Sequence, residues 1–170
     1  MPPSQIVISD ASVIIDLAKI RLIEATLSLP FEFVIPDAIF DAELIALAHY
    51  TPADLVRLGF VIGTLNSAEV AVAMKHYARH AARLSFNDCL ALTYAETKQC
   101  ILMTGDGPLR DVAQKTKIEV HGLLWAAKLM SDHRTCPNAR IAAGLQALRD
   151  EPSTRLPSAE LAALIALLKG

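Results

Sequence analysis

The sequence predicts an α/β protein in which helices cover both faces of a parallel sheet. Short β-branched apolar runs alternate with longer segments of helical periodicity along most of the chain, as in successive β–α–β units. The composition is 53% apolar with only 5% aromatic residues, which favours a compact, helix-rich globule. A length of 170 residues suits one domain with a small appendage.

In the first half of the chain, capping residues and a proline indicate where helices begin. Ser12 and Asp37 are placed to cap helices that follow two short apolar strands. Thr51 precedes Pro52, and proline is well tolerated at the first position of a helix. In chain order we expect a strand at 5–9, helices at 12–20 and 21–29, a strand at 31–36, helices at 37–50 and 52–58, a strand at 60–65 and a long helix at 67–84.

The second half continues the same alternation. Ser85 is placed to cap a helix, and Pro108 lies near the first turn of another. We expect a helix at 85–98, a strand at 100–104, a helix at 107–116, a strand at 118–120 and helices at 122–130, 139–149 and 158–168. A break at 131–139 separates the last two helices from the rest. We therefore predict a domain at 1–132 and a C-terminal helical extension at 133–170 that packs on this domain or on a partner subunit.

Composition and charge limit the classes of protein. The longest uncharged apolar stretches fall short of the roughly 20 residues that a membrane span needs. The first ten residues have neither the basic region nor the cleavage site of a signal peptide, so we expect a cytoplasmic protein. Cys89, Cys100 and Cys136 fit neither a disulfide framework nor a zinc spacing. A net charge of −2 argues against a general basic surface for nucleic acid, but leaves room for a local patch.

Four acidic residues are expected at one edge of the sheet. Asp10 and Asp106 each follow a strand directly, and ligands of parallel sheets gather at the carboxyl ends of the strands. Glu43 lies on the helix after the strand at 31–36, and Asp88 lies in the first turn of the helix opened by Ser85. Each acid alone has an ordinary explanation as a helix cap, a turn residue or a solvated charge. Their shared location predicts a common cleft.

Carboxylates gathered in one cleft repel one another, and a divalent cation is the natural compensation. Ligands that are all oxygen select hard ions such as Mg²⁺ or Mn²⁺. Such ions activate water and stabilise the charge that develops when a phosphodiester is cleaved. The acids therefore predict a metal site suited to phosphodiester hydrolysis. An aspartyl phosphatase is disfavoured because Ser12 stands where its second acid belongs, and "TGDGPLR" lacks the Lys-Ser or Lys-Thr of a P-loop.

These residues stand in segments that resemble the PIN-domain family, the nuclease fold of the VapC-type toxins. The matching segments are "VISDASVII", "VIPDAIFDAEL", "LSFNDCLAL" and "LMTGDGPLR", in the order of the family. The later "LRDVAQKTKIEVHGLLWAAKLM" resembles the end of such domains, and "RLPSAELAALI" resembles the C-terminal extension of one prokaryotic subgroup. The resemblance thus covers nearly the whole chain.

The resemblance implies a three-layer α/β/α fold and a metal-dependent endoribonuclease, in which metal-activated water leaves a 5′-phosphate and a 3′-hydroxyl. It also implies a homodimer and, for a toxin, silencing by a small cognate antitoxin. The residues that carry over as catalytic and metal-binding acids are Asp10, Glu43, Asp88 and Asp106, with Asp10 and Asp88 as the foremost ligands, and Ser12 and Thr104 carry over as supporting hydroxyls.

Two further features have more than one interpretation. Lys75, Arg79 and Arg83 recur every four residues, either as a stripe that contacts RNA phosphates or as an ordinary solvated face. Trp125 is expected in the core or at a dimer interface rather than as a platform for bases. At the level of the whole protein, the alternatives are a non-catalytic PIN-like module that binds RNA or protein and a housekeeping RNA-processing or DNA-cleaving nuclease without an antitoxin.

Overall fold

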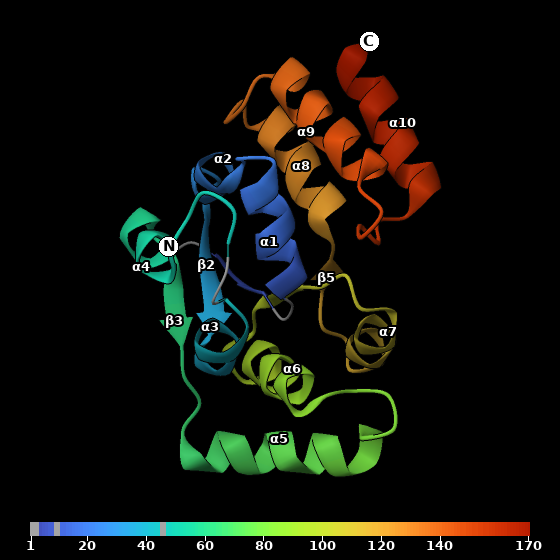
Figure 1. Ribbon diagram of the computed structural model, residues 1–170. Helices are drawn as coiled ribbons and strands as arrows, with labels where there is room; N and C mark the ends of the chain where they lie inside the picture. The colour runs from blue at the N-terminus through green and yellow to red at the C-terminus, as the bar shows by residue number, and fades with distance from the viewer. Residues whose placement is uncertain (1–3, 9–10, 45–46) are drawn as a thin grey trace.

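A computed structural model describes residues 4–8, 11–44 and 47–170, and in these ranges five parallel strands form the central sheet. Figure 1 shows the chain in ribbon form. The strand order is β3-β2-β1-β4-β5, and every described neighbouring pair is parallel. This sheet with helices on both faces confirms the predicted α/β fold. The strands are β1 (Ser4–Ile8), β2 (Phe31–Pro36), β3 (Val61–Gly63), β4 (Ile101–Met103) and β5 (Val120–His121).

The helices fall close to the ranges that periodicity predicts. Figure 1 shows α8, α9 and α10 gathered at one end of the molecule and α5 beneath α6 at the other. The helices are α1 (Ala11–Lys19), α2 (Ile23–Leu27), α3 (Asp37–Glu43), α4 (Pro52–Leu58), α5 (Ser67–His80), α6 (Phe86–Lys98), α7 (Gly107–Lys115), α8 (Leu123–Asp132), α9 (Asn138–Asp150) and α10 (Ser158–Lys169). No helix in the described ranges is both long and apolar enough to cross a bilayer.

Two hydrophobic clusters lie on opposite faces of the sheet. Side chains alternate along a strand, so Phe33 and Ile35 of β2 pack into the cluster that contains α1, α2 and α8. Val34, between them, packs into the other cluster with α6 and α7. The strands are apolar on both faces because both faces are covered, which is the expected pattern for a parallel sheet.

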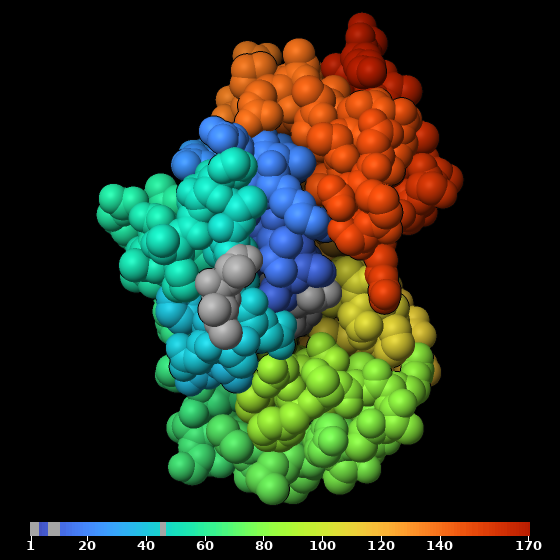
Figure 2. Space-filling view, in the orientation of Figure 1, coloured from blue at the N-terminus to red at the C-terminus, as the bar shows by residue number. Residues whose placement is uncertain are grey.

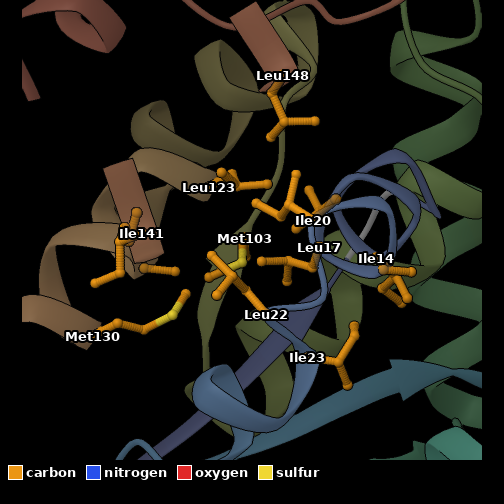
Figure 3. Close-up of a cluster of buried hydrophobic side chains, with 14 of the residues drawn as sticks. Ile14, Leu17, Ile20, Leu22, Ile23, Met103, Leu123, Met130, Ile141 and Leu148 are labelled. Atoms are coloured by element: carbon orange, nitrogen blue, oxygen red, sulfur yellow. The ribbon is translucent and has the colours of Figure 1, made fainter. Parts of the chain in front are cut away.

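The last two helices are part of the first cluster. Figure 3 shows Ile141 and Leu148 of α9 directed toward side chains of α1, α2 and α8. A Cβ atom on Gly144 would lie 3.2 Å from the Cβ of Ile20, so the absent side chain lets α9 approach the end of α1. Arg140 also donates a hydrogen bond to the carbonyl oxygen of Ile20 at 3.1 Å. The division of the chain at residue 132 stays a prediction.

Three local expectations are wrong. Helix α1 begins at Ala11, so Ser12 lies within its first turn rather than before it. The helix expected at 37–50 ends at Glu43, and the Tyr50 hydroxyl instead donates to Glu24 Oε2 at 2.7 Å. This contact joins positions that lie 26 residues apart in the sequence, and periodicity does not reveal it. Helix α5 ends at His80, so Arg83 lies in the following turn.

Candidate active site

Asp106 lies at the tip of β4, where it begins α7. Its Oδ2 atom accepts a hydrogen bond from the backbone N–H of Leu109 at 2.9 Å, which makes it the N-cap of that helix. Its own N–H donates to Oγ1 of the fully buried Thr104 at 3.0 Å. Within the described residues, Oδ1 of Asp106 makes no hydrogen bond. The cap therefore orients the carboxylate and leaves one oxygen for another ligand.

Asp88 is fixed in a similar way at the start of α6. Ser85 Oγ accepts from the Asp88 N–H at 3.1 Å, and Asp88 Oδ2 accepts from the Ser85 N–H at 2.8 Å, which together form a capping box. Ser85 is thus the cap that the sequence predicts. The neighbouring thiol of Cys89 is buried, and burial, together with the charge of Asp88, raises its pKa to about 11. This thiol stays protonated near neutral pH and is unsuited to nucleophilic or metal chemistry.

Glu43 reaches the same helix start from α3. Its Oε1 atom accepts a hydrogen bond from Nδ2 of Asn87 at 3.0 Å, and Asn87 directly precedes Asp88. Two segments that are far apart in sequence therefore deliver carboxylates to one place. The motifs in the sequence assign no role to Asn87. Its position beside an expected acid was the only available signal.

The strand order explains how these acids share one edge. Strand β4 lies beside β1, with Met103 paired to Ile8, so the two strands end at the same level. Helix α6 leads into the start of β4, so its first turn lies at the opposite, carboxyl edge of the sheet. The N-termini of α6 and α7 lie at this edge and favour negative charge there. Asp10, the predicted acid after β1, lies outside the described residues.

A cavity of about 900 Å³ opens beside Asp106. Ser12 and Thr104 also line it, so both predicted supporting hydroxyls lie next to this acid. Asp16 and Arg110 line the same cavity, and the motifs in the sequence assign neither a role. Asp16 follows Ser12 by one helical turn, and Arg110 belongs to the quoted segment "TGDGPLR". Their spacing from Ser12 and Asp106 could have indicated that both residues lie near the site.

Arg110 contributes a positive charge at the end of β4. Its Nη2 atom donates to the carbonyl oxygen of Thr104 at 3.1 Å. A Cβ atom on Gly122 would lie 3.2 Å from the same nitrogen, so the glycine leaves room for the guanidinium. A fixed cation at this point offsets part of the negative charge of the carboxylates.

The donor set suits a hard divalent cation in chemistry. Glu43, Asp88 and Asp106 offer only carboxylate oxygens, which Mg²⁺ and Mn²⁺ prefer. Within the described ranges, no group of three or more His, Cys, Asp or Glu side chains is close enough to hold a metal ion. The described acids therefore do not form a complete metal site by themselves, and the fourth predicted acid, Asp10, lies outside those ranges.

The basic residues of 75–83 have separate surroundings. Lys75 and Arg79 are exposed on α5, whereas Arg83, in the turn beyond it, forms an ion pair with Asp111 at 3.1 Å. Both side chains of that pair are about half exposed, so its contribution to stability is small, on the order of 0–1 kcal/mol. A role of these three cations in RNA binding stays a prediction.

Trp125 lies partly buried between two rings. It stacks on His121 with ring centroids 4.1 Å apart and an interplanar angle of 5°. Its centroid also lies 5.8 Å from that of Phe31. The tryptophan is therefore packed against the first hydrophobic cluster, in agreement with its predicted place in the core.

Comparison with known proteins identifies the family. A family model described as PIN domain matches residues 6–170, which is nearly the whole chain. No curated protein matches the chain significantly. PIN domains are generally nucleases and typically bind divalent metal ions. With its parallel sheet and the carboxylates at the start of α6 and α7, this chain belongs to the PIN-domain family.

Proposed function

We propose that this protein is a Mg²⁺- or Mn²⁺-dependent endoribonuclease and the toxin of a toxin–antitoxin pair. The observation that supports this most strongly is the shared placement of Asp88 and Asp106. Asp88 lies in the first turn of α6 and Asp106 is the N-cap of α7, both at the carboxyl edge of the sheet, and each carboxylate accepts a backbone N–H at its own helix start. Glu43 joins them through Asn87. A module that only binds RNA has no need of oriented, mutually repelling acids.

The proposed ligands of the cation are Asp10, Asp88 and Asp106, with Glu43 completing the set or orienting water. When bound, the cation supplies an activated water and neutralises charge on the phosphate. The protein holds Asp88 and Asp106 in fixed rotamers through the two caps, so little reorganisation is needed. Ser12 and Thr104 support the acids on the side of the cavity, and Thr104 does so by accepting the Asp106 N–H.

The remaining parts of the proposal concern partners and place. We propose an RNA substrate, a homodimer, a small cognate antitoxin that blocks the cleft, and a cytoplasmic location. They rest on the family and on the predicted subgroup, which the C-terminal sequence "RLPSAELAALI" suggested. A small gene for a DNA-binding antitoxin beside the gene of this protein would support the toxin over a housekeeping nuclease.

The test is cleavage of a mixed pool of structured RNAs by purified protein with Mn²⁺ or Mg²⁺, with a parallel reaction in EDTA. We compare Asp88→Asn with Asp54→Asn. Asp54 occupies the same capping-box position in α4, where its Oδ2 accepts from the Thr51 N–H at 2.8 Å. Both variants therefore remove one charge from one capping box, but only the first touches the proposed site.

The proposal expects cleavage that requires metal, survives Asp54→Asn and is lost in Asp88→Asn. Cleavage that persists in EDTA or in Asp88→Asn contradicts it. Wild-type protein that binds the RNA pool but never cuts it, with or without metal, favours the non-catalytic module instead.

A further inference from the structure

The cavity beside Asp106 continues as a groove to the C-terminal extension. We call it the extension groove. Its walls come from four parts of the chain that only the fold brings together: α1, the β4–α7 region, α8, and the segment that joins α9 to α10. The space-filling view shows the loop between α9 and α10 projecting beside α7 (Figure 2). The substrate side of the proposed active site is therefore bounded in part by the extension.

The extension is a structural wall of this groove. Leu156 packs against the first hydrophobic cluster, so the loop between α9 and α10 is anchored to the body of the protein. Lys19 Nζ donates to Ser153 Oγ at 3.4 Å across the groove. An anchored loop gives the groove a fixed shape, which pre-organised binding requires.

Charge is graded along α1. Ser12, Asp16 and Lys19 lie on one face of this helix, and Lys19 is about 10 Å along the axis from Ser12 at a rise of 1.5 Å per residue. The acidic end of the groove is therefore at the proposed active site, and a cation stands two turns away. Arg155 adds a second cation from the extension, and Glu160 offsets part of it.

The cations of the groove are available for a phosphate. Among the described residues, Lys19, Arg110 and Arg155 form no ion pair with a carboxylate. Lys19 and Arg155 are also exposed to solvent. Some cations elsewhere on the surface, such as Lys98 and Lys128, are paired with acids, whereas the exposed Lys115 and Lys169 are in no ion pair among the described residues. A charged ligand that enters the groove therefore meets cations that need not first break an ion pair.

The wall between these charges is apolar. Leu124 and Leu156 line it, together with Trp125, which is held in place by its stacking on His121. A cavity of about 900 Å³ lies within the roughly 300–1,000 Å³ range of small-molecule sites. Apolar walls between cations suit a nucleotide, which has a flat base and a charged phosphate.

We propose that the extension groove binds unpaired nucleotides of the RNA next to the phosphate that is cut. This inference rests on the proposed nuclease function and makes the C-terminal extension part of the substrate site. Bases of a duplex are stacked in pairs and cannot enter a concave apolar site, whereas a splayed base of a single strand can. Lys19 and Arg155 contact the backbone, and Leu124 and Leu156 contact the base.

The test measures binding of a short unstructured RNA oligonucleotide in EDTA, so that no cleavage is required. The variant is Lys19→Glu with Arg155→Glu. Its matched control is Lys115→Glu with Lys169→Glu, which reverses two charges at exposed positions outside the groove. We expect affinity to fall by about tenfold or more in the groove variant alone. The slope of log K against log salt should also flatten by about 0.7 for each phosphate that the variant no longer neutralises.

A second measurement does not depend on charge reversal. A 4-thiouridine-substituted RNA is photocrosslinked to Asp88→Asn protein, and the crosslinked peptides are mapped by mass spectrometry. Crosslinks at 121–125 or 153–157 support the groove. Crosslinks confined to Lys75 and Arg79 on α5, or equal affinity of the groove and control variants, overturn it.

The outcomes separate this inference from the function on which it rests. If wild-type protein cleaves RNA with metal but the groove variant binds RNA as well as wild type does, the nuclease function stands and RNA binding in the groove is rejected. If RNA binds in the groove but wild-type protein never cleaves it, RNA binding in the groove stands and the nuclease function is rejected.

Discussion

Asp106 offers the sharpest separation of a structural role from a chemical one. Its Oδ2 caps α7 by accepting the Leu109 N–H at 2.9 Å. Alanine removes this cap at a cost of about 1 kcal/mol, whereas asparagine caps about as well as aspartate. In a protein of this length, about 1 kcal/mol corresponds to roughly 2–4 °C in Tm. Without metal we therefore expect Asp106→Ala to lower Tm by roughly 2–4 °C and Asp106→Asn to leave it nearly unchanged.

The metal response of the same variants tests the chemistry. A cation that binds only the folded wild-type protein adds about 2.7 kcal/mol at one hundred times its Kd. We expect Mn²⁺ to raise the Tm of the wild type clearly and to have a much smaller effect on Asp106→Asn, whose cleavage of RNA is also lost. Thermal melts with and without Mn²⁺, beside a cleavage assay, give both readings. The reasoning is refuted if Asp106→Asn responds to Mn²⁺ and cuts RNA like the wild type.

Two further predictions concern stability. Gly63→Ala places a Cβ atom 2.5 Å from Val34 Cγ1, so we expect the free energy of unfolding, measured by urea denaturation, to fall by about 1–3 kcal/mol. Gly107→Ala, whose Cβ atom would have no atom within 4 Å, serves as a neutral control. Equal midpoints for the two variants contradict this. Burial raises the pKa of the Cys89 and Cys100 thiols from 9.0 to about 11. As the pH rises, the unfolded chain therefore loses these protons before the folded protein does. The free energy of unfolding should fall between about pH 9 and 11. Replacing both cysteines with alanine should flatten that fall, and an unchanged slope argues against it.

The parts of the fold that depend on local sequence could be predicted. Apolar strands that alternate with amphipathic helices along the chain predict the parallel sheet. Ser85 and Asp88, three residues apart, form a capping box that can be recognised in the sequence itself. The same locality explains why the sequence predicts Asp88 in the first turn of a helix and Asp106 directly after a strand, although not that Asp106 caps α7. In Asp106 the cap uses only Oδ2, so the structural explanation of this residue does not exclude a functional one.

The parts that depend on tertiary contacts could not be predicted. Helix α3 ends at Glu43, and Tyr50, which periodicity placed on the same helix, contacts Glu24 of α2 instead. Asn87 meets Glu43 across 44 positions of sequence. The extension groove likewise joins α1 to the loop before α10, and Lys19 meets Ser153 only in the folded chain. Periodicity describes one helix or strand at a time and gives no information about contacts between residues far apart in the sequence.

The central claim is that the acids at the carboxyl edge of the sheet bind a divalent cation. Titration of Mn²⁺ into metal-free protein, followed by electron paramagnetic resonance of the unbound ion, tests it most directly. We predict saturable Mn²⁺ binding by the wild type and by Asp54→Asn, and severely weakened binding by Asp88→Asn. Binding that is absent at millimolar Mn²⁺, or that is the same in all three proteins, would contradict it.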